Sequence, residues 1–176
     1  MYEQYFRLRV SPRLMRPLKI IGLPPSYQRV KTREAFDALP SDIVAYFMES
    51  AVPEVSGVIE DPSFLVCDPL KNLMQAYIPE LQAKTVQLFA GEPESKTSYR
   101  YWLPYIELVN CLSPQVERYP DGQPKKLILD ADAVSDRYCF RVGGILEQRI
   151  IVALPVAESI LRRCLYGVDL EPVEVI

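Results

Sequence analysis

The sequence predicts a single α+β domain, with a mostly antiparallel β-sheet and two main helices. Its 176 residues fit one domain, since compact domains usually hold about 100–200 residues. Sixteen prolines against seven glycines divide the chain into short elements and exclude a helical bundle or a coiled coil. With 49% hydrophobic residues and a formal net charge of −3, the composition also excludes a disordered chain. We therefore expect residues 1–176 to form one domain.

Residues 1–60 carry the weakest structural signals. Residues 6–10 alternate apolar and basic side chains, which predicts a half-buried strand near residues 5–10. Proline-bounded loops follow. The apolar stretch at residues 42–50 fits either one or two helical turns or a strand, so the pattern does not fix the structure of residues 11–60.

Clearer signals begin after residue 61. Residues 64–67 form a short apolar run that predicts a strand, and Asp68 followed by Pro69 is typical of a helix start with Asp68 as the N-cap. The helix is predicted over residues 69–77 because its apolar side chains recur at helical spacing and Pro79 follows. These side chains are Leu70, Leu73, Met74 and Tyr77.

Two further strands are predicted at residues 85–89 and from residue 126 onward, with a strand at residues 99–105 between them. In this middle strand tyrosine and leucine alternate with Arg100 and Trp102, so the two sets face opposite sides of the sheet. The tyrosine face is expected to be core. Trp102, on the other face with Arg100, is then either a surface anchor or part of a second packed layer.

The C-terminal third predicts a β-hairpin followed by a helix. Gly143 and Gly144 separate two apolar strands and suit a two-residue turn, which predicts a hairpin over residues 138–153. Pro155 starts a predicted helix over residues 155–165, and Gly167 suits a left-handed cap at its end. A closing strand is expected at residues 170–175, irregular or at an edge because of Pro172.

The residue types present exclude most catalytic chemistry. The chain has no histidine, which removes the commonest general base and the usual zinc ligand. It also lacks C-x-x-C, G-x-S-x-G, G-x-G-x-x-G and P-loop motifs, so we assign no catalytic, cofactor-binding or metal-binding residue. The four cysteines (Cys67, Cys111, Cys139 and Cys164) each lie beside apolar residues and are expected to be reduced core thiols, although a disulfide remains open.

One motif points to an enzyme. The apolar residues 127–129 lead into Asp130 and Asp132, an arrangement that looks like the first motif of haloacid dehalogenase-type phosphatases. There the first aspartate is the phosphoryl nucleophile and the second an acid/base, with magnesium balancing the charge. That chemistry also needs a downstream lysine, and no lysine follows Lys126. A magnesium-dependent phosphatase using Asp130 and Asp132 is therefore the weaker alternative, and turn or N-cap roles are more usual.

Charge is unevenly distributed along the chain. Through Arg33 there are eight basic residues and one acidic residue, Glu3, whereas the remainder is acidic. Because the basic residues interleave with apolar ones, we expect ordered strand and loop and no nucleic-acid partner. A general adaptor or scaffold using this basic segment is the third alternative. The charge-free stretch 20–28 is too short for a signal-peptide core or a membrane span, so a cytoplasmic location is expected.

Short motifs between Phe64 and Val175 resemble, in their order, a family of bacterial immunity proteins encoded beside polymorphic toxins and formerly catalogued as a domain of unknown function. Residues 61–176 are thus the family-like part of the chain. The matching motifs are residues 64–68 (Phe-Leu-Val-Cys-Asp), 101–104 (Tyr-Trp-Leu-Pro), 111–113 (Cys-Leu-Ser), 139–142 (Cys-Phe-Arg-Val), and 151–152 leading through 157–163 and Gly167 to 170–173.

The resemblance implies a non-enzymatic protein that binds and neutralises a cognate toxin domain in the cytoplasm of the producing cell. It supplies no catalytic residues, cofactor or metal. It names neither the toxin nor an oligomeric state. The candidate contact residues lie on the outward face of the 99–105 strand and in the acidic stretch that follows residue 129. These residues are Arg100, Trp102, Asp130, Asp132 and Asp136.

Overall fold

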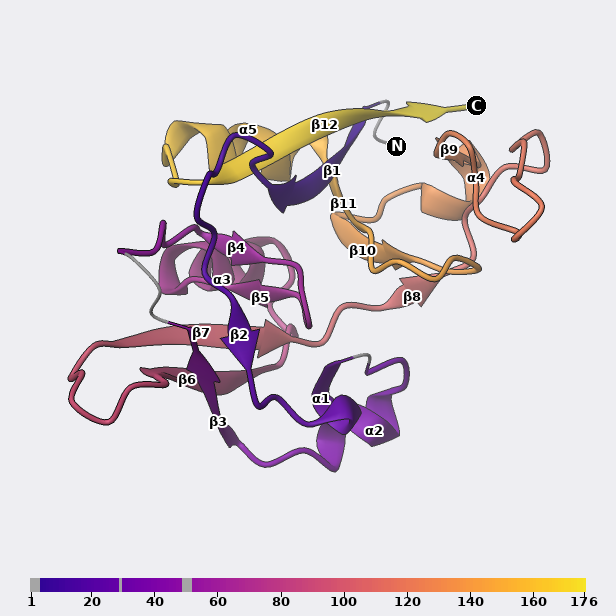
Figure 1. Cartoon of the computed structure of the whole chain (residues 1–176). Helices are drawn as coiled ribbons and strands as arrows, with labels where there is room; N and C mark the ends of the chain where they lie inside the picture. The colour runs from indigo at the N-terminus through magenta and orange to yellow at the C-terminus, as the bar shows by residue number, and fades with distance from the viewer. Residues whose placement is uncertain (1–3, 29, 49–51) are drawn as a thin grey trace. The chain divides into compact units, whose positions relative to one another are not determined.

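The computed structural model describes residues 4–28, 30–48 and 52–176 (Figure 1). It confirms the α+β class, mostly strand with two main helices, α3 (Asp68–Tyr77) and α5 (Leu154–Arg162). These helices lie where the sequence predicted them. Among the helices in the described ranges, none combines the length and the apolar character needed to cross a membrane.

The chain separates into two compact units. The first unit holds the described residues up to Arg9 together with Ile106–Arg163 and Leu170–Ile176, and the second holds Val10–Tyr105 and Cys164–Asp169. The chain therefore passes between the units four times, and neither unit is a continuous segment. That residues 1–176 form one domain stays a prediction.

The first unit contains a six-stranded sheet with the strand order β8-β10-β11-β1-β12-β9. Strand β1 confirms the strand predicted at residues 5–10, and it pairs antiparallel with β11. The core of this unit includes Tyr5, Leu129, Phe140 and Ile151. The strands are β1 (Tyr5–Val10), β8 (Leu108–Val109), β9 (Ile128–Leu129), β10 (Cys139–Val142), β11 (Ile150–Ala153) and β12 (Val168–Val175), and a short helix, α4 (Ala131–Val134), follows β9.

The hairpin predicted over residues 138–153 is present, because β10 and β11 pair antiparallel. The predicted two-residue turn is wrong: residues 143–149 form a longer loop, and only Gly144 has a positive φ, of 74°. Glycine is instead needed at position 143 because the backbone there lies too close to Val109 and Asn110 to leave room for a side chain. The Gly143 N–H donates to the Val109 carbonyl at 2.7 Å, and an added Cβ would lie 2.3 Å from Oδ1 of Asn110.

The end of α5 also differs from the prediction. The helix ends at Arg162, and the left-handed residue that follows it is Cys164, with φ 48°, so Gly167 is not its cap. Gly167 has φ 68°, and a Cβ added there would lie 2.5 Å from the Cβ of Ser56, so its conformation and its surroundings both favour glycine. Strand β12 begins just after it, two residues before the predicted strand.

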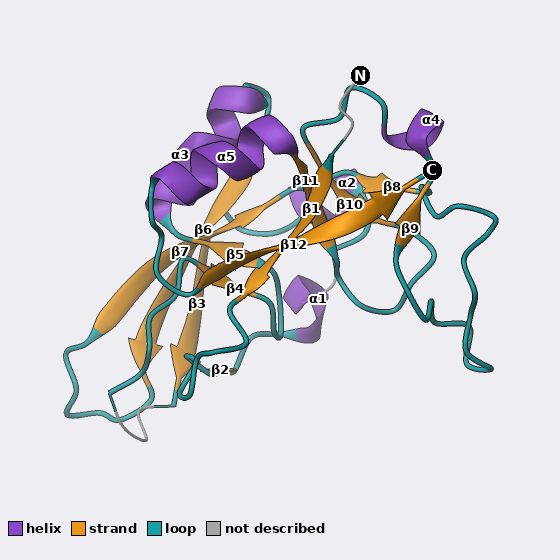
Figure 2. Ribbon diagram, turned by 90° about the horizontal axis from the view of Figure 1, so that it is seen from above, coloured by secondary structure: helices purple, strands orange, loops and turns teal. Residues whose placement is uncertain are grey.

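The second unit contains a six-stranded sheet with the strand order β2-β3-β6-β7-β5-β4. Figure 2 shows β3, β6 and β7, which pair in that order, as its long central strands. Strand β3 shows that residues 42–47 of the ambiguous stretch are a strand; residues 49 and 50 lie outside the described ranges. The elements are β2 (Ile20–Ile21), β3 (Asp42–Phe47), β4 (Val58–Ile59), β5 (Leu65–Val66), β6 (Ala83–Ala90), β7 (Ser98–Pro104), α1 (Pro25–Gln28) and α2 (Arg33–Asp37), besides α3.

The two sheets confirm the mostly antiparallel prediction. The strand pairs β3–β6, β8–β10 and β9–β12 are parallel, and the other registered pairs of the described residues are antiparallel. In the second unit, side chains alternate along β3 so that Ile43, Ala45 and Phe47 are buried in the core. The alternate side chains of the same strand point to the opposite, outer face.

Candidate functional site

Five large apolar side chains are exposed around the outer face of the second unit's sheet, and we call them the outer patch. Strand alternation and register place three of them side by side: Ile21 on β2 pairs with Tyr46 on β3, which pairs with Phe89 on β6. Each is 41–52% exposed. The outer patch consists of Ile21, Val44, Tyr46, Met48 and Phe89.

The predicted contact residues Trp102 and Arg100 lie on the same sheet but under α3. Both are directed to the face opposite the buried Tyr101, as predicted. The Asp68 carboxylate accepts a hydrogen bond from Nη2 of Arg100 at 2.5 Å and another from Nε1 of Trp102, and the Lys71 ammonium lies 4.5 Å from the Trp102 ring centre. Trp102 is therefore half-buried in a second packed layer, and Arg100 is exposed. Their role as partner contacts stays a prediction.

The Asp68 carboxylate does not cap α3. Cys67 occupies the N-cap position and Asp68 is the first helical residue, so the predicted N-cap was wrong by one position. The Asp68 side chain is instead directed to β7, where the hydrogen bond from Arg100 is the largest cause that lowers the pKa of Asp68. The local sequence correctly predicted a helix start near residue 68. It could not predict that the Asp68 carboxylate bonds Arg100 and Trp102, because these residues lie more than thirty positions later.

The predicted acidic residues belong to the first unit. Asp130 is the N-cap of α4: its Oδ1 accepts the N–H groups of Asp132 at 3.0 Å and Ala133 at 3.2 Å. Asp132 and Asp136 are exposed, and Asp136 has a positive φ of 62°. In the part of the chain that the structure describes, no group of three or more acidic or cysteine side chains is placed to hold a metal ion. That these aspartates contact a partner stays a prediction.

The four cysteines are present as thiols. Cys111 is buried, and burial raises its pKa to about 11. Burial likewise raises the pKa of the Cys139 thiol to about 12 and that of Cys67 above its usual value. These three thiols are therefore poor nucleophiles near neutral pH. The prediction that all four are core thiols was wrong for Cys164, which is exposed.

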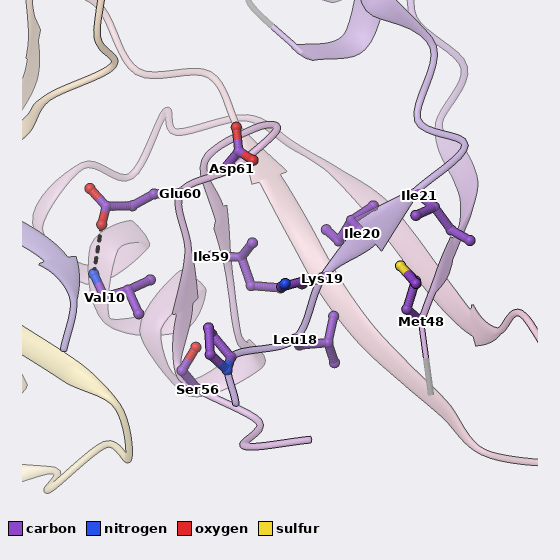
Figure 3. Close-up of a pocket in the computed structure, with 11 residues that line it drawn as sticks. Val10, Leu18, Lys19, Ile20, Ile21, Met48, Ser56, Ile59, Glu60 and Asp61 are labelled. Atoms are coloured by element: carbon purple, nitrogen blue, oxygen red, sulfur yellow. Dashed lines mark hydrogen bonds between the residues drawn. The ribbon is translucent and has the colours of Figure 1, made fainter. Parts of the chain in front are cut away.

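A pocket of about 470 Å³ lies in the second unit between β2 and β4 (Figure 3). Figure 3 shows Ile59 of β4 on one side and Leu18, Lys19 and Ile20 on the other. The lining also includes Glu60 and Asp61 on the β4 side, and Ile21 and Met48 of the outer patch. Apart from Val10 and Asp61, its lining falls within residues 11–60, where the sequence pattern gave no structure, and the short apolar run around β2 was the one available signal.

The wall of the pocket near β2 is anchored by Glu54. Its Oε2 accepts the N–H groups of Met15 at 2.7 Å and Arg16 at 2.6 Å, and the Tyr166 hydroxyl donates to its Oε1 at 2.8 Å. The hydrogen bond from the Arg16 backbone is the largest cause that lowers the pKa of Glu54. The anchored carboxylate places Pro17 at the pocket and fixes the approach to β2.

No protein-family model matches this chain, and no curated protein is significantly similar to it in sequence.

Proposed function

We propose that this chain is a non-enzymatic binding protein and that the outer patch is where it contacts another protein. The observation that carries the proposal is the row Ile21, Tyr46 and Phe89, which crosses three neighbouring strands with each side chain 41–47% exposed. Tyrosine, phenylalanine and methionine are enriched at protein interfaces. A contiguous set of such side chains on a sheet face is typical of an interaction site.

The setting of the outer patch supports a binding role. The patch lies on strands whose opposite side chains are buried in the core, so its shape is held before any partner arrives. A preorganised surface loses less conformational entropy on association than a mobile one. The outer patch would form the apolar centre of an interface of roughly 800 Å² on this chain.

More specifically, we propose that the chain is an immunity protein that neutralises a cognate bacterial toxin domain in the cytoplasm of the producing cell. The resemblance of residues 64–175 to such a family motivates this assignment. The roles of the acidic side chains support a binding role over catalysis: Asp130 caps a helix and Asp68 bonds Arg100 and Trp102.

The test uses the C-terminal domain of a secreted toxin encoded next to this gene. Co-expression of this chain should restore growth of cells that make the toxin domain, and the two proteins should co-purify. The substitution Tyr46→Asp should weaken binding at least a hundredfold and abolish rescue, because it places a charge at the centre of the interface. Tyr119→Asp is the matched control: Tyr119 has a similar exposure, 52%, but lies outside the outer patch, and its substitution should leave affinity within twofold.

Three results would count against the proposal. Full rescue by the Tyr46→Asp protein would show that the outer patch is not part of the interface. A neighbouring operon of metabolic enzymes would remove the toxin assignment. Magnesium-dependent hydrolysis of p-nitrophenyl phosphate that disappears in Asp130→Asn would favour the phosphatase alternative.

A further inference from the structure

We propose that the pocket between β2 and β4 receives an extended segment of the partner protein, one that carries a lysine or arginine beside an apolar side chain. This inference rests on the proposed binding function and names how the partner is held. It concerns residues of the second unit only, all in the described part of the chain.

The first argument is the placement of the two edge strands. In the strand order of the second unit, β2 and β4 stand at opposite ends, yet residues of both line the same pocket. The sheet thus curves until its two edges face each other across a gap (Figure 3). Edge strands present unpaired backbone groups and are templates for strand addition by another chain.

The second argument is the direction of the backbone groups on β2. The Met48 N–H donates to the Lys19 carbonyl at 3.0 Å, so the backbone N–H and C=O of Lys19 are directed toward β3 in the antiparallel ladder. Because successive residues of such a ladder alternate, the N–H and C=O of Ile20 are directed away from β3, toward the open edge. These two groups are the donor and the acceptor that an added strand would use.

The third argument is the chemistry of the lining. Leu18, Ile20 and Ile59 supply an apolar surface that suits an aliphatic or aromatic side chain. The β4 side carries two carboxylates: Glu60, whose Oε2 accepts the Val10 N–H at 2.9 Å, and Asp61, which is exposed. Lys19 is the one cation among the lining residues, and Asp61 is the exposed carboxylate that an incoming side chain can reach. A lysine or arginine side chain on the incoming segment therefore complements the pocket, whereas an acidic one is repelled.

The pocket is continuous with the outer patch, since Ile21 and Met48 belong to both. A partner seated on the patch would thus contact part of the pocket lining at the same time. This continuity, with the strand edges, favours a segment of the same protein partner over a separate small molecule. We expect the segment to add to the sheet edge as a strand, which sets its register, while the pocket binds one of its side chains and gives specificity.

The experiment selects ligands from a phage-displayed library of random ten-residue peptides against the full chain. In the enriched peptides, apolar residues should alternate with polar ones, and lysine or arginine should be present. The affinity of these peptides is then measured with synthetic copies. Asp61→Lys should reduce affinity at least tenfold and Asp61→Asn by a smaller factor. Glu94→Lys, which makes the same charge reversal at an exposed residue of the same unit outside the pocket lining, should leave affinity within twofold.

Strand addition is tested separately from charge. Ile20→Pro removes the N–H at the open edge, and Ile20→Val keeps it, so only the proline variant should lose binding. Circular dichroism melting verifies that the variants fold. If Ile20→Pro unfolds the chain, the readout is a selected peptide N-methylated at alternate amides, which should bind at least tenfold more weakly.

The proposal is overturned if the library yields no enriched peptide, or if the enriched peptides keep their affinity for Asp61→Lys. Undiminished binding of N-methylated peptides would show capture of side chains alone and also overturn it. Its failure is separable from failure of the proposed function. If binding of the toxin domain is weakened by Tyr46→Asp but not by Asp61→Lys or Ile20→Pro, the outer patch is part of the interface and the pocket is not.

Discussion

Two buried tyrosine hydroxyls each fix a distant segment of the chain. In the first unit the Tyr5 hydroxyl donates to the Val134 carbonyl at 2.5 Å, and in the second the Tyr101 hydroxyl donates to the Ser56 carbonyl at 2.6 Å. Both side chains are almost completely buried, and burial raises the pKa of both. The Val134 carbonyl also accepts the Arg137 N–H at 3.2 Å, whereas loss of the Tyr101 hydroxyl would take this donor from the buried Ser56 carbonyl. The Tyr101 hydroxyl is therefore the more important of the two for stability.

We expect Tyr101→Phe to lower the free energy of unfolding by about 1–2 kcal/mol, because it removes the hydroxyl that satisfies the Ser56 carbonyl. The pKa of Tyr101 is raised in the folded state, so its contribution is present below pH 10 and is lost as pH rises through and above that value. Urea unfolding at several pH values should show wild-type stability falling above about pH 10 more steeply than that of the variant.

Tyr119→Phe serves as the control for this prediction, because its side chain is exposed. It should leave the stability at pH 7 unchanged. Equal alkaline slopes for wild type and Tyr101→Phe would show that Tyr101 ionises in the folded protein as readily as in the unfolded chain.

Local patterns predicted the elements whose side-chain period extends over several residues. Helix α3 has its apolar side chains on one stripe, and β7 alternates over its length, so both were predicted from the sequence. Strands β2 and β4 have two residues each, which is too short for any period. The loop after β10 was predicted too short because its geometry depends on β8, a strand about thirty residues earlier.

The candidate site was less predictable than the fold for the same reason. The face of Trp102 followed from alternation, but its cover by α3 depends on where Asp68 reaches across to β7. The outer patch depends on the parallel register that places Tyr46 beside Phe89, forty-three positions later. Pairing between distant strands leaves no trace in local periodicity, so neither the patch nor the pocket was predicted.

The loop between α5 and β12 yields a test at the level of an element. We expect Gly167→Ala to lower the free energy of unfolding by about 2–4 kcal/mol. It combines a φ of 68° with a new Cβ 2.5 Å from the Cβ and 3.2 Å from the Cα of Ser56. Gly122→Ala is the control, since Gly122 has φ 84° but no atom within 4 Å of an added Cβ, and it should cost about 1 kcal/mol. Urea denaturation measures both, and equal losses would show that the approach to Ser56 is relieved by a small shift.

The division into two units was not predicted, because composition and length describe the chain as a whole. Each unit has its own sheet and its own cluster of buried side chains. Strand β1 pairs with β11, more than 140 positions later, so the first unit closes only when both ends of the chain are in place. Segment boundaries read along the sequence, such as a division at residue 60, therefore do not coincide with the units.

The two units are expected to respond separately to cavities in their cores. Leu88→Ala in the second unit should cost about 2–5 kcal/mol and speed hydrogen exchange of amides in β3, β6 and β7 more than in β10 and β11. Ile151→Ala in the first unit should show the reverse. Exchange followed by mass spectrometry distinguishes the cases. Equal acceleration in both units by either variant would show one cooperative structure and confirm the single-domain prediction.

The four passages of the chain between the units also bear on inheritance. All six strands of the second unit's sheet lie between Ile20 and Pro104, so one contiguous block of DNA can encode that sheet and its outer patch. Such a block leaves behind Cys164–Asp169, the part of the same unit in which the Tyr166 carbonyl accepts the Gly57 N–H at 2.8 Å. A recombinant that receives the block is therefore expected to need a 164–169 loop that fits Gly57, because the loop of the donor gene does not travel with it.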